Sequence, residues 1–432
     1  MQAVTHVPAF DSEETRSSTD LFALLDSAEQ TRSFRGRVDV GNRRLATSLS
    51  LEHLAAGDRK TGGGERVVPS EYEQTAGRIA VSVTPDEKRA WFFDAHFLEQ
   101  PETPRTDELT TGFGQAEPSS SEYLFKPNRR LFAHARYAHT DGALGLDWRA
   151  DLSFQRIDDD RVTRDLNAAE RTIERNSSNL TGVMVTAASG SADRTWIAGV
   201  EYYHDKVASD RQQEDVVSGM RQAVTARFPV GSSVEQAALF WNSDFRIDDR
   251  HAINGGLRIC RVSVELTDTP VSSATSITAT DLSGDLGWRY DATPEWQLLA
   301  NAGFGFRAPN VFDLGTLGSR PGNRFNVPNT TLDSERVVQL DTGVRRRGET
   351  WQLEFTLFAL RYDDRITSLS TGEVTPQGRD IVQSVNAAES RIHGMEAGIH
   401  VALTQLVELE AVINFTRGRQ ELAGSSEPAD RI

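Results

Sequence analysis

Residues 146–156 read LDWRADLSFQR, a stretch in which apolar and polar side chains alternate as far as Gln155. The apolar members are Leu146, Trp148, Ala150, Leu152 and Phe154. Because successive side chains of a β-strand point to opposite faces, this pattern predicts a strand with one apolar and one polar face. Similar alternation recurs at 296–306 and 351–359, so such strands are a repeated feature of the chain.

The length of these runs bears on whether the sheet is soluble or membrane-spanning. Strands of soluble sheets usually have about five or six residues, whereas a tilted strand needs about ten to cross a bilayer. The runs have about ten residues or more, which favours membrane-spanning strands. A soluble β-sandwich or solenoid remains the alternative, because its strands alternate too.

The links between the runs alternate in length along the whole chain. The pattern predicts about sixteen strands, near 33–40, 44–54, 77–84, 90–98, 129–138, 145–156, 178–187, 194–204, 235–247, 252–264, 280–290, 296–306, 336–346, 351–362, 390–403 and 407–417. Short turns are predicted at 41–44, 84–88, 139–144, 189–194, 247–251, 291–295, 346–350 and 403–406. Long polar links are predicted near 55–76, 99–128, 157–177, 205–234, 265–279, 307–335 and 363–389, and in the tail after 417. Short turns at one rim and long loops at the other are typical of outer-membrane β-barrels.

Four tryptophans support the same interpretation. Trp91, Trp196, Trp296 and Trp351 each follow a predicted short turn. Indole rings gather at the interface between a membrane and water, so four of them in one position indicate an aromatic girdle.

Composition excludes several function classes. The 432-residue chain carries a net charge of -16, which argues against binding to nucleic acid. It has no run of about 18 apolar residues for a membrane helix. Cys260 is the single cysteine and the histidines are scattered, so we expect neither a disulfide nor a metal site. Cys260 is expected to be lipid-facing or packed. No nucleophile–base pair or phosphate-binding loop is visible, so no enzymatic activity and no cofactor are expected.

The most specific segment is FGFRAPNVFDLGTLGSRPGNRFNVPNTTLDSE at 304–335. It contains Phe306-Arg307-Ala308-Pro309, then Asn326-Val327-Pro328-Asn329, Leu332 and Glu335. This resembles the signature of the TonB-dependent outer-membrane receptors: a strand ending in aromatic-Arg-Ala-Pro, an external loop, then Asn-Pro-Asn-Leu with Pro-Glu. Two features depart from it, since Val327 separates Asn326 from Pro328 and Asp333-Ser334 precede Glu335 in place of proline. The stretch SVNAAESRIHGMEAGI at 384–399 resembles a further family motif through Asn386, Ala388, Gly394 and Glu396.

The resemblance implies an all-β fold, an antiparallel transmembrane β-barrel with about sixteen strands present of about 22. Residues 1–32 are expected to hold the end of the plug, the plug–barrel junction and the first external segment. Residues 33–432 are expected to form the barrel, truncated at its C-terminal side. The strands near 33–40 and 407–417 would then be unpaired edges. MQAVTHVPAF at the start lacks the pattern of a signal peptide, so signal peptide, TonB box and plug are expected upstream.

The resemblance also implies a function: TonB-dependent active uptake of a scarce ligand across the bacterial cell outer membrane. The expected partners are outer-membrane lipid, the TonB–ExbB–ExbD system acting through the plug and its TonB box, and a small-molecule ligand. Haem receptors of the family tend to carry a histidine between the two motifs. None lies between Phe306 and Asn329, so a ferric siderophore or similar organic iron complex is expected. Without its plug the chain is expected to be inactive. A passive porin-like channel is the alternative function.

The resemblance places candidate ligand contacts in the external loop, at Arg307, Arg320, Asn323, Arg324 and Phe325. Arg307 has two interpretations: a loop anchor or ligand contact, and, the one we favour, an arginine paired with a neighbouring carboxylate. Gly394 is expected at a close-packed strand position, and Glu396 is expected to face inward. The residues that carry the family motifs are Phe306, Arg307, Ala308, Pro309, Asn326, Pro328, Asn329, Glu335, Asn386, Gly394 and Glu396.

Overall fold

The computed structural model describes residues 6–112, 114–269, 273–315, 317–320, 324–404, 406–422 and 425–428. The chain divides into two compact units. Unit 1 comprises Met1–Val185, Tyr203–Val234 and Leu266–Ala274, and unit 2 comprises Thr186–Tyr202, Glu235–Glu265 and Thr275–Ile432. Among the described residues, no helix has the length and apolar character needed to cross a membrane.

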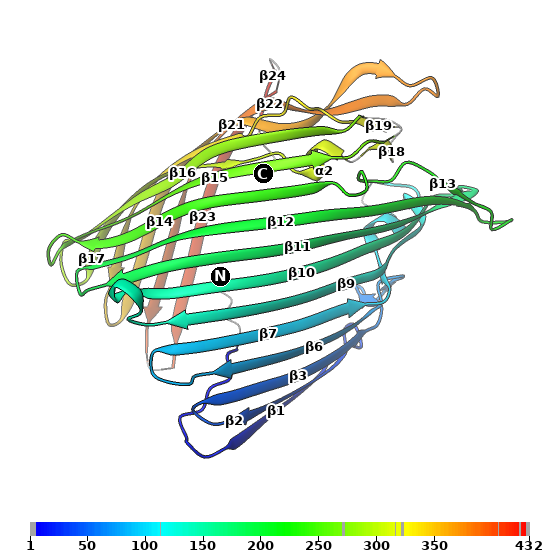
Figure 1. Cartoon of the computed structure of the whole chain (residues 1–432). Helices are drawn as coiled ribbons and strands as arrows, with labels where there is room; N and C mark the ends of the chain where they lie inside the picture. The colour runs from blue at the N-terminus through cyan, green and yellow to red at the C-terminus, as the bar shows by residue number, and fades with distance from the viewer. Residues whose placement is uncertain are drawn as a thin grey trace. The chain divides into compact units, whose positions relative to one another are not determined.

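Unit 1 is built from long antiparallel strands that follow one another in chain order, as the blue-to-cyan part of Figure 1 shows. They are β1 (Arg16–Leu25), β2 (Arg32–Gly41), β3 (Leu45–Ala56), β6 (Tyr72–Val83), β7 (Arg89–Gln100), β9 (Ser120–His139) and β10 (Asp147–Asp165). β11 (Glu170–Gly190) and β12 (Arg194–Asp215) contribute to both units. Short elements lie in the links: β4 (Arg59–Lys60), β5 (Arg66–Val67), β8 (Thr103–Pro104), α1 (Thr106–Leu109), η1 (Ala143–Gly145) and β13 (Arg221–Ala223).

Unit 2 repeats this order. Its long strands are β14 (Ser233–Arg246), β15 (His251–Leu266), β16 (Thr275–Asp291), β17 (Trp296–Arg307), β20 (Glu335–Arg347), β21 (Trp351–Val374), β22 (Asp380–Ala402) and β23 (Glu408–Leu422). From β16 onward these strands pair antiparallel in chain order. Between β17 and β20 lie α2 (Val311–Gly315), β18 (Gly318–Arg320) and β19 (Arg324–Val327), and β24 (Ser425–Pro428) follows β23.

The strands expose apolar side chains and cover polar ones, the reverse of a soluble sheet. In β2, Val38 and Val40 are 42% and 43% exposed, whereas Asp39 between them is 7% exposed. In β15 of unit 2, Leu257 is half exposed and Cys260, on the opposite face, is buried. An apolar exposed face and a polar covered face characterise strands that stand in lipid. We call these the outer and inner faces. Cys260 is therefore packed on the inner face and does not face lipid.

All the predicted strands are present, which confirms the all-β, antiparallel fold class. The short links observed are 42–44, 84–88, 140–146, 191–193, 247–250, 292–295 and 348–350, as predicted. The last predicted turn, 403–406, contains residue 405, outside the described part. Trp91, Trp296 and Trp351 lie at the short-turn ends of their strands, and the Trp296 and Trp351 rings meet edge to face at 6.3 Å.

The expectation that residues 33–40 form an edge strand is wrong. β1 pairs with β2 along its whole length, from Arg16↔Gly41 to Leu25↔Arg32, so residues 33–40 are not an edge. β1 was missed because RSSTDLFALL is polar in its first half and continuously apolar in its second, without alternation. The assignment of residues 1–32 to a plug–barrel junction stays a proposal.

The predicted links 157–177, 205–234 and 363–389 are also much shorter than expected. β10, β11, β12, β21 and β22 have 19 to 24 residues each, so these hairpins continue far beyond the length that crosses a membrane. Beyond the lipid both faces of a strand meet polar surroundings, so the apolar alternation stops while the backbone ladder continues. Periodicity therefore cannot reveal these extensions.

Candidate functional site

The loop that carries the family signature leaves the sheet of unit 2 at the end opposite the short turns. β17 and β20 pair without a break from Trp296↔Arg346 to Arg307↔Glu335. Arg307 and Glu335 are thus register partners at the last rung, and residues 308–334 form the loop between them. Pro309, which has no N–H to donate to a ladder, is fully buried just after this rung.

Arg307 is held by two carboxylates. Its Nε and Nη2 each donate to Glu335 at 2.8 Å, and its Nη1 donates to Asp313 of α2 at 2.7 Å. Burial raises the pKa of Glu335, but hydrogen bonds from Arg307 and from the Ile366 N–H outweigh burial, so the pKa of Glu335 is lowered. The pKa of Arg307 is raised, chiefly by its bonds to Glu335. The carboxylate pairing that the sequence favoured for Arg307 is therefore present, and it ties both ends of the loop together.

The loop has a small apolar core of its own. Its buried members are Pro309, Val311, Leu314, Leu317 and Leu332, and Val382 of β22 is buried as well. Gly318 has φ of +76°, a conformation that glycine adopts without strain, where the chain turns into β18. The loop is thus a packed structure on the strand ends and not an open tether.

Asn386 joins the loop to the strands. Its Oδ1 accepts from the Asp333 N–H at 2.9 Å, and its Nδ2 donates to the carbonyls of Asp333 and Asp364 at 2.9 and 2.7 Å. Asp364 has φ of +58° at an irregularity in the β21–β22 pairing. The sequence identified Asn386 by resemblance alone, and the structure supplies its role as a clamp.

The hairpin of β18 and β19 brings the candidate ligand contacts together. Arg320 and Arg324 are register partners, and Phe325 follows on β19. β19 runs parallel to β22 with Arg324 opposite Asp380 and Phe325 opposite Ile381. The exposed Arg324 lies at the start of β19. Asn323, the remaining candidate, lies outside the described residues.

Two further motif residues, Pro328 and Asn329, are hydrogen-bonded to β22. Asn329 donates through Nδ2 to the Ser384 carbonyl at 2.8 Å, and the Pro328 carbonyl accepts from Gln383 at 2.8 Å. Asn326 lies in β19, and Phe306 and Ala308 flank Arg307.

Gly394 lies opposite Phe358, and a Cβ there would fall 2.6 Å from the Phe358 ring and 2.4 Å from the Phe415 carbonyl. This agrees with the close packing expected at that position. Glu396 accepts from Asn414 at 3.3 Å and shares the inner face with Gly394.

The inner face of unit 1 carries dense ion pairs. Asp151 accepts from His134, Arg136 and Arg149 at 2.6 to 2.8 Å. His6, near the start of the described chain, contacts the inner-face Asp39 at 3.2 Å, and its carbonyl accepts from Arg78 at 2.8 Å. The segment that follows His6 includes the fully buried Pro8. Residues 6–8 therefore rest on the polar side of β2 and β6.

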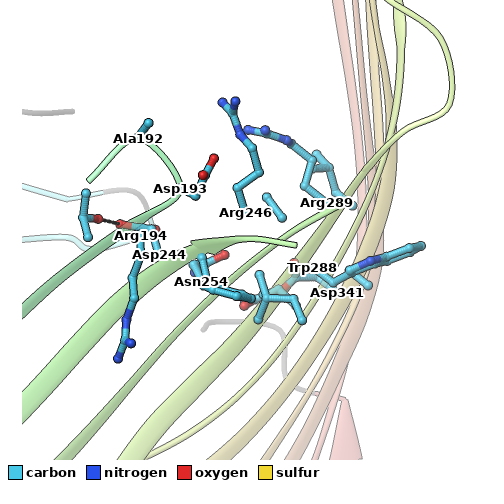
Figure 2. A pocket seen from close by; sticks show the side chains of 17 residues that line it. Ala192, Asp193, Arg194, Asp244, Arg246, Asn254, Trp288, Arg289 and Asp341 are labelled. Atoms are coloured by element: carbon cyan, nitrogen blue, oxygen red, sulfur yellow. Dashed lines mark hydrogen bonds between the residues drawn. The ribbon is translucent and has the colours of Figure 1, made fainter. Parts of the chain in front are cut away.

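A pocket of about 590 Å³ lies in unit 2 near the short turns (Figure 2). Its labelled polar lining is Asp193, Arg194, Asp244, Arg246, Asn254, Arg289 and Asp341. Asp193 belongs to the short turn before β12, and the others come from the short-turn halves of β12, β14, β15 and β16 and from β20. The pocket is thus at the other end of the strands from the signature loop and is not part of that candidate site.

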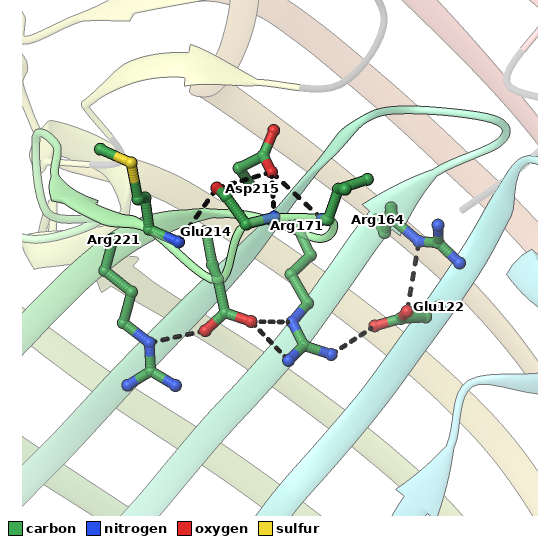
Figure 3. A network of polar contacts seen from close by, with 9 residues as sticks. Glu122, Arg164, Arg171, Glu214, Asp215 and Arg221 are labelled. Atoms are coloured by element: carbon green, nitrogen blue, oxygen red, sulfur yellow. Dashed lines mark hydrogen bonds and ion pairs between the residues drawn. The ribbon is translucent and has the colours of Figure 1, made fainter.

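A polar network that sequence reasoning missed joins the extended hairpins of unit 1 (Figure 3). Arg171 contacts Glu122 at 3.6 Å and Glu214 at 2.5 Å, Arg164 contacts Glu122 at 3.2 Å, and Arg221 contacts Glu214 at 2.6 Å. Hydrogen bonds from Arg221 and then Arg171 lower the pKa of Glu214. The sequence signal for this network is the density of arginines in stretches that the pattern predicts to be polar links.

Within the described residues, no group of three or more histidine, cysteine, aspartate or glutamate side chains is arranged to hold a metal ion.

Comparisons with known proteins agree with this fold. A family model described as "TonB dependent receptor-like, beta-barrel" matches residues 69–430. No curated protein matches the chain at a significant level.

Among solved structures, "Copper transporter OprC" superposes with a TM-score of 0.80 at 19% identity, over 95% of this chain and 62% of that one. The ferric yersiniabactin uptake receptor FyuA from Yersinia pestis gives 0.69 at 13% identity, over 96% and 62%. The ferric citrate transporter FecA gives 0.69 at 13%, over 97% and 61%. The chain thus spans less than two thirds of these proteins, and at such identities the likeness is one of fold.

Proposed function

Because the chain belongs to the TonB-dependent receptor β-barrel family, whose members reside in the bacterial outer membrane and act in transport, we propose that it takes part in active uptake of a ferric siderophore or similar organic iron complex. In this proposal the barrel works with a gated plug domain. The TonB–ExbB–ExbD system supplies the energy by pulling on that plug.

The observation that carries the proposal is the signature loop and its anchor. Arg307, Glu335, Asp313 and Asn386 fix a loop with its own core at the external rim of unit 2. A fixed loop can present a preformed surface to a ligand, which lowers the entropy lost on binding. A passive pore has no need of such a surface.

The chemistry of the hairpin favours an anion. Arg320 and Arg324 are register partners, so two guanidinium groups are brought to one short hairpin, and guanidinium groups are well suited to bind anionic oxygens. Complexes of ferric iron with carboxylate or catecholate siderophores carry negative charge. We therefore propose that Arg320, Arg324 and Phe325, with Asn323, contact the iron complex, while Arg307 supports the loop from beneath.

The test is iron uptake by cells that lack their own siderophore receptors. Such cells would receive this chain joined to an upstream plug domain, and radioactive iron uptake would be followed for a panel of ferric siderophores. Uptake that needs both a functional TonB and a ferric siderophore is the expected result. Arg324→Gln should reduce it, whereas Arg289→Gln, at the opposite rim, should not.

Two outcomes would contradict the proposal. Equal uptake with and without TonB would indicate a passive channel. Uptake of a copper salt in place of every iron complex would show that the ligand class is wrong. The chain expressed without any plug should give no TonB-dependent uptake.

A further inference from the structure

Three arginines stand directly opposite one another across three neighbouring strands of unit 2. Arg361 of β21 is the register partner of Arg391 of β22, and Arg391 is the partner of Arg419 of β23. The side chains of Arg361 and Arg391 are 54% and 61% exposed. Like charges placed directly opposite in a sheet are destabilising. The row is therefore unfavourable by itself, and a bound anion would relieve it.

The row belongs to the outer face. Val338 of β20 is the register partner of Arg361 and is 56% exposed. Four residues from the arginines toward the short turns, the same face carries the exposed side chains of Leu357, Met395 and Phe415. The arginines thus lie on the outer face, directly beyond its apolar surface.

The height of the row matches a membrane interface. Register pairs show that Trp351 of the aromatic girdle is level with Val401 and Leu409, and each arginine lies ten residues further along its strand. Ten residues span about 34 Å along a strand, which corresponds to about 26 Å of height at a tilt of about 40°. The apolar band of an outer-membrane barrel is about 25 Å tall. The row therefore lies where the external leaflet places its headgroups.

Carboxylates compensate only part of this charge. Asp363 contacts Arg361 at 3.0 Å, and Glu389 contacts Arg361 at 3.4 Å and Arg391 at 2.7 Å. Both carboxylates lie on the side of the row away from the apolar surface. The side of the arginines that faces the apolar surface is open to an approaching headgroup.

The β23 side of the patch is more positive. Arg417 lies one rung below Arg419 on the same face, opposite His393. Among the side chains that the structure describes, which do not include those of 425–428, no carboxylate lies within ion-pair distance of Arg417 or Arg419. Glu421, opposite Glu389, is the next acidic residue along β23. Positive charge thus accumulates toward β23, directly above Phe415.

We propose that Arg361, Arg391 and Arg419 form a binding site for the phosphate groups of a phosphorylated lipid of the external leaflet. Its acyl chains lie on the apolar surface below, around Leu357 and Phe415. The planar guanidinium group binds phosphate oxygens through two parallel hydrogen bonds, which a row of arginines can offer to more than one phosphate. This site is on the outer face and is separate from the uptake of a ligand through the signature loop.

The test measures lipid retention by the purified full chain in detergent, using native mass spectrometry. The probes are a hexa-acyl diphosphoryl glucosamine lipid and the same lipid without phosphates. The wild-type chain should retain the phosphorylated lipid at least tenfold better. The variant R361Q/R391Q/R419Q should lose this preference, and Arg391→Gln alone should reduce it about fivefold. The control R250Q/R289Q/R347Q removes the same charge from the short-turn rim and should keep the preference.

A gel shift on heating establishes that each variant is folded, and Arg391→Gln is the readout if the triple variant is not. Equal retention of the two lipids by the wild type would overturn the proposal. So would a preference that survives loss of the arginines, or competition by inorganic phosphate at the same concentration as the lipid. The last result would show a site for free anions in place of a lipid.

Discussion

Replacing Arg307 with alanine should open the signature loop without unfolding the sheet. Arg307 makes three charge-assisted hydrogen bonds, to Glu335 and Asp313, whose side chains are 16% and 13% exposed. Each such bond contributes about 1.5–3 kcal/mol when shielded from solvent, but the contributions are not additive. The arginine side chain is 42% exposed, so solvent screening reduces them further. We expect the free energy of local opening to fall by about 2–3 kcal/mol.

Hydrogen exchange read by mass spectrometry measures this opening directly. A fall of about 2–3 kcal/mol should accelerate exchange in peptides from 308–334 by about 30- to 150-fold. Peptides from 296–306 should be unchanged, because the β17–β20 ladder does not depend on the side chain of Arg307. Arg345→Ala is the matched control, since it removes another arginine–glutamate pair, with Glu354 at 2.6 Å, near the far end of β20.

Unchanged exchange in 308–334 would refute the argument that Arg307 anchors the loop. Equal acceleration in 296–306 would refute it as well, because the loop and the sheet would then open as one unit. An effect of Arg345→Ala on the loop would show that the response is not specific to the anchor.

Three further outcomes are expected. Acid should open the same loop, because the pKa of Glu335 is lowered in the folded protein and its carboxylate therefore stabilises the loop fully above the ordinary glutamate range. This stabilisation is lost as the pH falls through the folded-state pKa, so hydrogen exchange should accelerate only in that acidic range. An exchange rate that does not change with pH would contradict this. Asn386→Ala should speed hydrogen exchange around Asp333 about tenfold or more, because three hydrogen bonds are lost. The same exchange rate in the variant and the wild type would show that these hydrogen bonds are not needed to hold the loop. Gly394→Ala should lower the free energy of unfolding of the sheet by about 1–3 kcal/mol in urea titrations. Gly398→Ala should not, because its Cβ would meet nothing within 4 Å, and equal effects of the two substitutions would refute the packing argument.

The sequence determined the fold class through two patterns with direct physical causes. A strand that stands between lipid and a polar interior must alternate, so residues such as those in 146–156 revealed it. Turns at one rim must be short, which fixed where the strands begin and end on that side. The motif of Phe306 to Pro309 then indicated the family before any contact was known.

The sequence did not determine what happens beyond the lipid. In β1 and in the extensions of β10 and β11 both faces carry polar or unpatterned residues, so alternation gives no signal there. The structure alone places Glu122 beside Arg171 and Arg171 beside Glu214, since these contacts depend on strand register.

The same division holds within the candidate site. The composition of 304–335 indicated a loop of special importance, but not that Arg307, Asp313 and Glu335 meet, nor that Asn386 clamps Asp333. Such contacts join residues up to 53 positions apart, and their distances follow from how neighbouring strands are paired. Local pattern is set by the solvent on each face of a strand, whereas a site is set by register, and register is a property of the folded sheet.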